Sequence, residues 1–154
     1  MGTAMDLILW RHAEAEDGVP DLLRKLTPKG ARQAQRMAEW LERHLPERCR
    51  ILASPAARAQ ETAQALGRRF RTVDDIAPGA SAAAVLAAAG WPDARETTLV
   101  VGHQPALGEV VALLIGGEEQ PWSVRKGGLW WLSSRRRGES AAVVVRVVMS
   151  PDFL

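Results

Sequence analysis

Two histidines and two arginines are the side chains of this 154-residue sequence that are best placed to do chemistry. Arg11 and His12 follow one apolar run of the chain, Arg58 comes shortly after a second, and His103 comes after a third. Guanidinium groups bind phosphate oxygens in a bidentate way and stay charged at any working pH. A neutral histidine beside them can attack phosphorus and carry the phosphoryl group until water removes it. Cationic neighbours lower the pKa of such a histidine, so these residue types predict phosphoryl transfer.

The apolar runs before these residues are typical of buried parallel strands, and a helix is predicted after each of them. The predicted strands cover residues 7–10, 50–53 and 97–101, with a weaker candidate at 72–76. The predicted helices begin with a capping residue or a proline and cover residues 27–45, 54–66 or 54–70, 81–89 and 105–115. Strands that alternate with helices predict an α/β fold with a mostly parallel sheet.

Near the end of the chain, residues 128–132 and 142–149 flank a polar segment at 133–140 and predict an antiparallel hairpin. The basic cluster 135–137 is interpreted as a solvated turn rather than as a binding patch. The predicted fold is therefore a three-layer α/β sandwich around a mostly parallel sheet with an antiparallel C-terminal hairpin. Ligands of such sheets bind beyond the carboxyl ends of the strands, where the candidate histidines and arginines are expected to meet.

The composition fits a single domain over residues 1–154, with 47% hydrophobic and 25% charged residues and a net charge of +2. This charge does not indicate a nucleic-acid partner, and no apolar run is long enough to span a membrane. No secretion signal is visible, and the single Cys49 excludes an internal disulfide and fits a reducing cytoplasm. Met5 is an alternative start that would make residues 1–4 a leader or an addition.

Four motifs resemble those of the histidine phosphatase superfamily, whose fold is phosphoglycerate mutase-like, and in particular its SixA-type phosphohistidine phosphatases. Leu-Trp-Arg-His-Ala at 9–13 resembles the Arg-His-Gly/Ala signature, and Ser-Pro-Ala-Ala-Arg-Ala-Gln-Glu-Thr at 54–62 is similar to Ser-Pro-x-x-Arg-Ala-x-x-Thr. Gly-His-Gln-Pro at 102–105 resembles the third motif, and Arg-Lys-Leu-Thr-Pro-Lys-Gly at 24–30 resembles an Arg-x-Leu-Thr-x-x-Gly element. Each motif alone has a structural alternative, but four in the family's order favour membership.

The resemblance implies a role for each residue at a matching position. His12 would be the nucleophile that becomes phosphorylated, and Arg11 and Arg58 would bind the phosphoryl group. His103 would contact that group from the opposite side, and Arg24 would be a further phosphate contact. Two further candidates at the rim of the site are Ser54 and Gln104. Either could instead cap its helix, which is the preferred interpretation for the serine.

No metal or other cofactor is expected, because a cationic cluster repels metal ions and no acidic ligand set is visible. Larger members of the family insert segments that form a lid and supply a carboxylic general acid. This chain has only a short, Ala-rich stretch between residues 62 and 96, and the proton donor is not obvious. Glu14 is the nearest acid to His12, but a solvated loop position is the preferred interpretation.

A substrate that needs little acid catalysis fits such a site. Imidazole titrates near ~6.5 and can leave phosphorus as a neutral ring, whereas an alkoxide is a poor leaving group. We therefore expect a cytoplasmic phosphohistidine phosphatase in signal transduction. It would release inorganic phosphate from a partner protein such as a histidine-containing phosphotransfer domain or a phosphocarrier. The alternatives are a phosphatase for small phosphate esters and a phosphohistidine-binding adaptor with low turnover.

Overall fold

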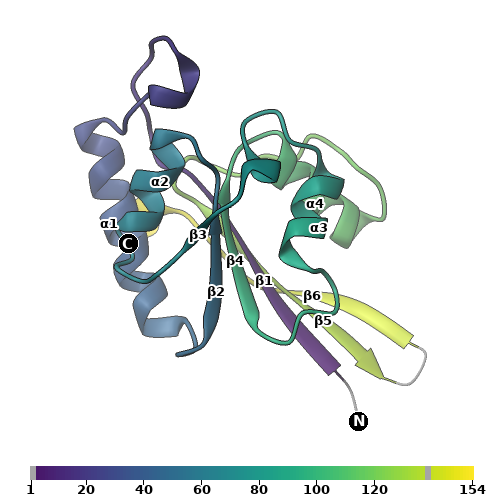
Figure 1. Cartoon of the computed structure of the whole chain (residues 1–154). Coiled ribbons are helices and arrows are strands. Elements are labelled where there is room, and N and C mark those ends of the chain that lie inside the picture. Colours follow the sequence, from purple (N-terminus) through teal and green to yellow (C-terminus); the bar gives the residue numbers. More distant parts are fainter. Residues whose placement is uncertain (1–2, 138–139) are drawn as a thin grey trace.

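The computed structural model of the chain describes residues 3–137 and 140–154. Its centre is a six-stranded sheet with the order β3-β2-β4-β1-β5-β6 (Figure 1). The strands are β1 (Thr3–Arg11), β2 (Cys49–Ala53), β3 (Arg71–Thr72), β4 (Thr97–Gly102), β5 (Leu129–Arg137) and β6 (Ser140–Met149). The first four pair in parallel, and β5 and β6 pair antiparallel at one side of the sheet, as predicted.

Helices cover both faces of the sheet and complete the three predicted layers. On one face lie α1 (Pro28–His44) and α2 (Ala57–Gln64), and on the other lie α3 (Ala82–Ala89) and α4 (Ala106–Gly116) (Figure 1). Three short 3-10 helices lie in the connections and at the end of the chain: η1 (Asp21–Leu23), η2 (Asp74–Ile76) and η3 (Pro151–Phe153). Within the described residues, no helix combines the length and apolar character needed to cross a membrane.

The starts and ends of the helices follow from local sequence, with one exception. The Thr27 hydroxyl accepts a hydrogen bond from a backbone N–H in the first turn of α1, and Gly90 ends α3 in the left-handed conformation, as predicted. The start predicted for α2 at Ser54 is wrong: its N-cap is Ala56, and the helix ends at Gln64. The reason is that the backbone N–H of Ser54 still bonds to β4, so the chain turns into the helix two residues later.

Two other predicted segments differ from the structure. Of the weak strand predicted at 72–76, only Thr72 lies in β3, and residues 74–76 form η2. The polar turn predicted at 133–140 is shorter, because β5 runs through the basic cluster to Arg137. These polar residues form a strand because they pair on both sides: Arg135 lies opposite Ala4 of β1 and Ala142 of β6. Residues 3 and 4 thus extend β1, while residues 1–2 and 138–139 lie outside the described residues.

Two apolar clusters, one on each face of the sheet, hold the layers together. Successive residues of β1 alternate between them: Ile8 and Trp10 pack in the cluster of α1 and α2, and Leu7 and Leu9 pack in that of α3 and α4. All four side chains are fully buried, and each contributes about 1.5–3 kcal/mol of burial free energy. The end of β1, where the candidate residues begin, is therefore anchored from both faces.

Two glycines let helices contact the loops at the carboxyl-end edge of the sheet. A Cβ at Gly30 in α1 would lie 1.9 Å from the carbonyl oxygen of Glu14. A Cβ at Gly108 in α4 would lie 1.7 Å from the carbonyl oxygen of Trp122. Both distances are far inside van der Waals contact, so these loops reach the helix backbone only because neither position carries a side chain.

Replacing one of these glycines is expected to separate the loop from its helix. Gly108→Ala should destabilise the fold by about 1–3 kcal/mol, the usual cost of overpacking. Gly116→Ala in the same helix is the control, because the nearest atom to its added carbon would lie 3.7 Å away. Alanine is favoured over glycine in helices by about 0.5–1 kcal/mol, so the control should be neutral or stabilising. Urea unfolding measures both variants, and equal stabilities would contradict the close approach.

Candidate active site

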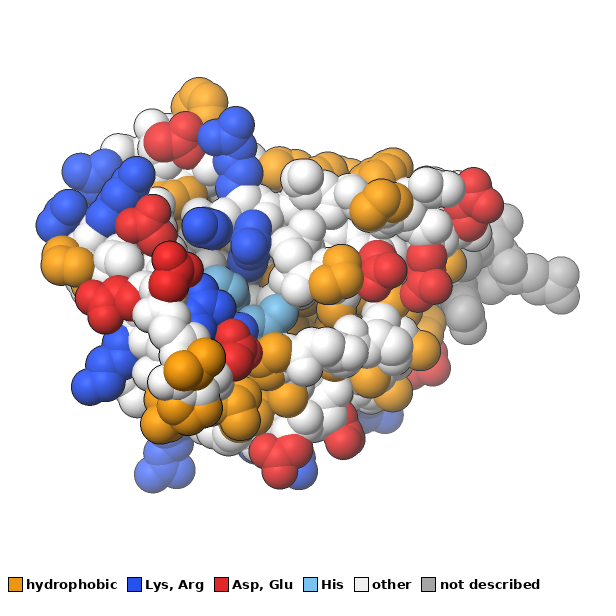
Figure 2. Space-filling model, turned by 90° about the horizontal axis from the view of Figure 1, so that it is seen from above, with side chains coloured by type: hydrophobic (Ala, Val, Ile, Leu, Met, Phe, Trp, Pro, Cys, Tyr) orange, Lys and Arg blue, Asp and Glu red, His pale blue; other side chains and the backbone are white. Residues whose placement is uncertain are grey.

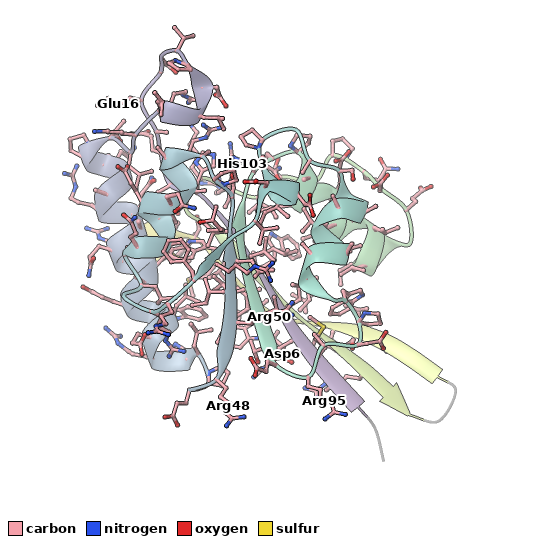
Figure 3. The ribbon with its side chains drawn as sticks, viewed as in Figure 1. Asp6, Glu16, Arg48, Arg50, Arg95 and His103 are labelled. Carbon is pink, nitrogen blue, oxygen red and sulfur yellow. The ribbon has the colours of Figure 1, made fainter. Side chains whose placement is uncertain are left out.

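The carboxyl ends of β1, β2 and β4 bring the predicted residues together at one edge of the sheet. The backbone N–H of His12 donates to the carbonyl of Gly102, and that of Ser54 donates to the carbonyl of Val101, both at 3.1 Å. These bonds continue the pairing just past the ends of β1 and β2. His103 follows β4 at the same edge (Figure 3), and its ring centroid lies 5.2 Å from that of His12.

A backbone hydrogen bond sets the tautomer of His12. Its Nδ1 lies 2.7 Å from the carbonyl oxygen of Ala13. A carbonyl oxygen only accepts, so Nδ1 carries the proton and the lone pair is on Nε2. Burial is the main cause that lowers the pKa of His12 to about 4, and the charges of Arg58, Arg11 and Arg24 act in the same direction. The ring is therefore neutral at neutral pH, as a nucleophile requires.

Ser54 is bound to the second histidine instead of capping α2, which corrects the preferred interpretation of this serine. Its Oγ lies 2.7 Å from Nε2 of His103 and also accepts from the backbone N–H of Ala56 at 3.2 Å. When the hydroxyl donates to Nε2, the ring proton of His103 is on Nδ1, a buried atom with no partner among the described residues. Burial, and then the neighbouring His12, lower the pKa of His103 to about 3.

Three arginines surround the histidines, and one carboxylate links two of them. Arg58, in the first turn of α2, donates to the backbone carbonyl of Asp21 at 2.9 Å and to its carboxylate at 3.1 Å. Arg24 binds the other carboxylate oxygen at 3.0 Å, and these two partners hold the pKa of Asp21 below its usual range. Arg11 donates to the carbonyl of Val124 at 2.9 Å. Burial and the charge of Arg58 lower the pKa of Arg11.

A pocket of about 210 Å³ opens over the two histidines. In Figure 2 the histidines lie in a hollow, with basic side chains around it. The residues that line the pocket are Arg11, His12, Ala15, Arg24, Arg58, Pro78, His103, Gln104 and Lys126. All the predicted site residues except Ser54 line the pocket, and Ser54 is bound to His103. None of these described lining residues carries a carboxyl group, so the pocket is suited to an anion.

Lys126 lines this pocket although the sequence analysis does not single it out. It lies shortly before β5, which runs antiparallel to β1. The amino end of β5 is therefore at the same edge as the carboxyl end of β1, and the backbone N–H of Arg11 donates to the carbonyl of Gly128 at 2.9 Å. The predicted antiparallel hairpin was the signal that could have found this lysine, because the loop before such a strand reaches the site.

Two other polar side chains near the pocket hold loops in place. Gln104 is at the rim and also binds the start of α4: its Oε1 accepts from the backbone N–H of Gly108 at 2.8 Å. Its Nε2 donates to the carbonyl of Trp122 at 2.9 Å. The carboxylate of Glu14 accepts from the Thr27 hydroxyl at 2.8 Å, and Glu14 is not among the residues that line the pocket.

The neutral, buried His12 is expected to make stability depend on pH. In the unfolded chain a histidine titrates near ~6.5, whereas the pKa of folded His12 is about 4. Between these values the unfolded state binds a proton that the folded state does not, so stability falls as the pH decreases from ~6.5 towards about 4. Between pH 7 and 5, the Tm of the wild-type protein should fall more steeply than that of His12→Gln. Parallel Tm curves in a calorimetric series would contradict this assignment.

Known proteins are similar to this chain in sequence and in fold. The family model of the histidine phosphatase superfamily (branch 1) matches residues 7–79. The phosphohistidine phosphatase SixA homolog of Haemophilus influenzae is 33% identical over 128 residues, which are 73% of this chain and 78% of the relative. The phosphohistidine phosphatase SixA of Escherichia coli is 30% identical over 126 residues, or 76% of this chain and 78% of the relative.

A solved structure has a similar fold over nearly the whole length of this chain. The protein histidine phosphatase SixA complexed with tungstate superposes with a TM-score of 0.76 and 27% sequence identity, covering 97% of this chain and 99% of that one. The fold that it shares includes the sheet edge where the two histidines and three arginines meet. On these matches, the chain belongs to the histidine phosphatase superfamily.

Proposed function

We propose that this protein is a phosphohistidine phosphatase that removes phosphate from a histidine of a partner protein through a phosphorylated His12. The observation that carries the proposal is the neutral His12, whose Nδ1–H is bound to Ala13, in a pocket with three arginines and no carboxylate among its described lining residues. The names of the two SixA relatives support this substrate class. Tungstate, a tetrahedral oxyanion, in a related structure supports the binding of a phosphoryl group.

The reaction has two steps at His12. Nε2 attacks phosphorus, the P–N bond to the substrate imidazole breaks, and that imidazole leaves neutral because its other nitrogen already carries a proton. The phosphorylated His12 ring holds a positive charge, which the Nδ1–H bond to the Ala13 carbonyl stabilises. Water then attacks phosphorus, one of its protons passes to a phosphoryl oxygen of the released phosphate, and the electron pair of the P–Nε2 bond returns to the ring. Arg11, Arg58 and His103 bind the phosphoryl oxygens in both steps.

The lack of a carboxyl group among the described residues that line the pocket supports phosphohistidine over a phosphate ester as the substrate. An alkoxide needs a proton from the enzyme as it leaves, whereas a neutral imidazole does not. Glu14 is bound to Thr27, and Asp21 has a lowered pKa that keeps its carboxylate ionised. Neither is suited to donate the proton.

The partner would be a phosphotransfer domain or a phosphocarrier protein, and the single Cys49 fits a cytoplasmic location.

The covalent intermediate can be trapped directly. Rapid acid-free quenching during turnover of a ³²P-phosphohistidine protein should leave alkali-stable, acid-labile label on a peptide that contains His12. His12→Ala should abolish both the label and phosphate release, because the variant lacks the nucleophile and Nε2 of His103, the other neutral histidine of the pocket, is bound to Ser54. Label on another residue, or full turnover by the variant, would contradict the mechanism.

Substrate preference separates the proposal from its alternatives. We expect kcat/KM to be highest for a phosphohistidine protein, lower for an aryl phosphate, and lower by orders of magnitude for a sugar phosphate, because the leaving groups become progressively more basic. A chelator should change none of the rates. Equal turnover of the sugar phosphate would favour an ester phosphatase, and a single burst of phosphate without turnover would favour an adaptor.

The two arginines bound to Asp21 are expected to differ in importance. The Arg58 side chain is only 6% exposed, whereas that of Arg24 is 25% exposed, so water screens Arg24 more strongly. Arg58→Ala should lower kcat/KM by about a hundredfold or more, the usual effect of losing a charged transition-state contact. Arg24→Ala should cost much less. Equal and small losses in steady-state assays of correctly folded variants would place the phosphoryl group elsewhere.

A further inference from the structure

A second, larger hollow opens beside the catalytic pocket, with a volume of about 920 Å³. It lies between the first half of α1, the loop at 123–126 and the C-terminal turn at 150–152, and we call it the basic groove. It shares Arg11, Gln104 and Lys126 with the catalytic pocket. A polypeptide lying in the basic groove would therefore lie directly next to a phosphoryl group bound at His12.

One wall of the basic groove is a stripe of positive charge on α1. Lys29, Arg32 and Arg36 all line the groove, and their spacing of three and four residues places them on one face of the helix. At ~1.5 Å per residue, the stripe extends for about 10 Å, or two turns of helix. All three side chains are exposed, and none of them forms an ion pair with another described residue.

The basic groove carries more positive charge than the chain as a whole. Six basic and two acidic side chains are among the described residues that line it, although the net charge of the whole sequence is only +2. Both acids already have partners: Glu14 accepts from the Thr27 hydroxyl, and the Asp152 carboxylate lies 3.8 Å from Arg125. The six basic side chains still outnumber the two acids, so the surface that adjoins the catalytic pocket keeps an excess of positive charge.

We infer that the basic groove docks an acidic segment of the phosphorylated partner protein, about two helical turns long, while the phosphohistidine of that partner enters the pocket. This inference rests on the proposed function, since a protein substrate brings a surface along with its phosphohistidine. Opposite charges at this distance attract the partner and orient it before the reaction. Nucleic acid would suit the charge but has no histidine to place in the adjoining pocket.

Docking outside the pocket has a specific kinetic signature. Loss of the groove contacts should raise KM for a protein or peptide substrate and leave kcat nearly unchanged, because these contacts are the same in the ground and transition states. A small aryl phosphate does not reach α1, so its kcat/KM should not change. The preference for an acidic substrate should also weaken as salt is added, since the charges are exposed.

The test reverses the charge of the stripe in one variant, Lys29→Glu/Arg32→Glu/Arg36→Glu. Lys29 lies in the first turn of α1, where an acidic residue is favourable, and Arg32 and Arg36 are exposed, so α1 should still fold. The probes are synthetic peptides with one phosphohistidine flanked by glutamates, glutamines or lysines, together with an aryl phosphate. The wild-type protein should prefer the glutamate peptide to the glutamine peptide by about tenfold or more in kcat/KM at low salt. The variant should lose this preference and favour the lysine peptide.

The matched control changes three exposed arginines elsewhere, Arg48→Glu/Arg69→Glu/Arg95→Glu, with the same change in net charge. Figure 3 shows Arg48 and Arg95 at the end of the sheet opposite His103. The control should keep the wild-type peptide preference. Equal behaviour of the two triple variants, or an equal loss with the aryl phosphate, would overturn the docking inference.

A measurement of peptide binding distinguishes a failure of this inference from a failure of the proposed function. If the wild-type protein hydrolyses no phosphohistidine peptide, the proposed function fails. Fluorescence anisotropy of the unphosphorylated glutamate peptide still tests the groove, and binding that is lost only in the Lys29, Arg32 and Arg36 variant would support docking. A short DNA duplex that binds the groove more tightly than this peptide would overturn the choice of a protein partner.

Discussion

The parallel pairing of β1 with β4 is the constraint on which the rest of the site depends. Arg11 lies opposite Gly102 at the end of this pairing, and the N–H of His12 then bonds to the Gly102 carbonyl. This register puts the two histidine rings, which are ninety-one positions apart in the sequence, at a centroid distance of 5.2 Å. A slip of one residue would turn every side chain of β1 to the other face and remove His12 from the pocket. The apolar clusters on both faces of β1 therefore stabilise the fold and the chemistry through the same contacts.

The site places positively charged arginines where solvent is largely excluded. Backbone carbonyls and one carboxylate stabilise these charges, but some donor atoms have no partner among the described residues. Arg11 is bound to the Val124 carbonyl, and Arg58 to Asp21, while the Nε atoms of both arginines are buried without a partner among the described residues. Nδ1 of His103 is also buried without a partner among the described residues. Unpaired donors in a buried, cationic site are costly, and a bound anion would offset part of that cost.

The placement of His12 and His103 could be predicted from the sequence, because apolar runs followed by polar residues mark strand ends and parallel strands share an edge. The roles of Ser54 and Asp21 could not, since each depends on a hydrogen bond to a residue far away in the chain. Local propensity favours a helix start at Ser54, but the bond of its backbone N–H to the Val101 carbonyl of β4 overrides that propensity. The antiparallel hairpin was predicted, but the extension of β5 through the basic cluster to Arg137 was not, because a polar segment has no strand periodicity and becomes a strand only by pairing on both sides.

The surface around the pocket, and not the chemistry inside it, must determine which partner protein is bound. A pocket that binds a phosphoryl group and releases neutral imidazole treats every phosphohistidine alike, since neither step depends on the sequence around that histidine. Discrimination between proteins must therefore come from contacts outside the pocket. Arg11 links the two regions, because it lines both the pocket and the basic groove and its guanidinium is held by the Val124 carbonyl in the loop between them. A partner that contacts this loop would therefore act on the arginine that we propose binds the phosphoryl oxygens, which would couple recognition of the protein to positioning of its phosphate.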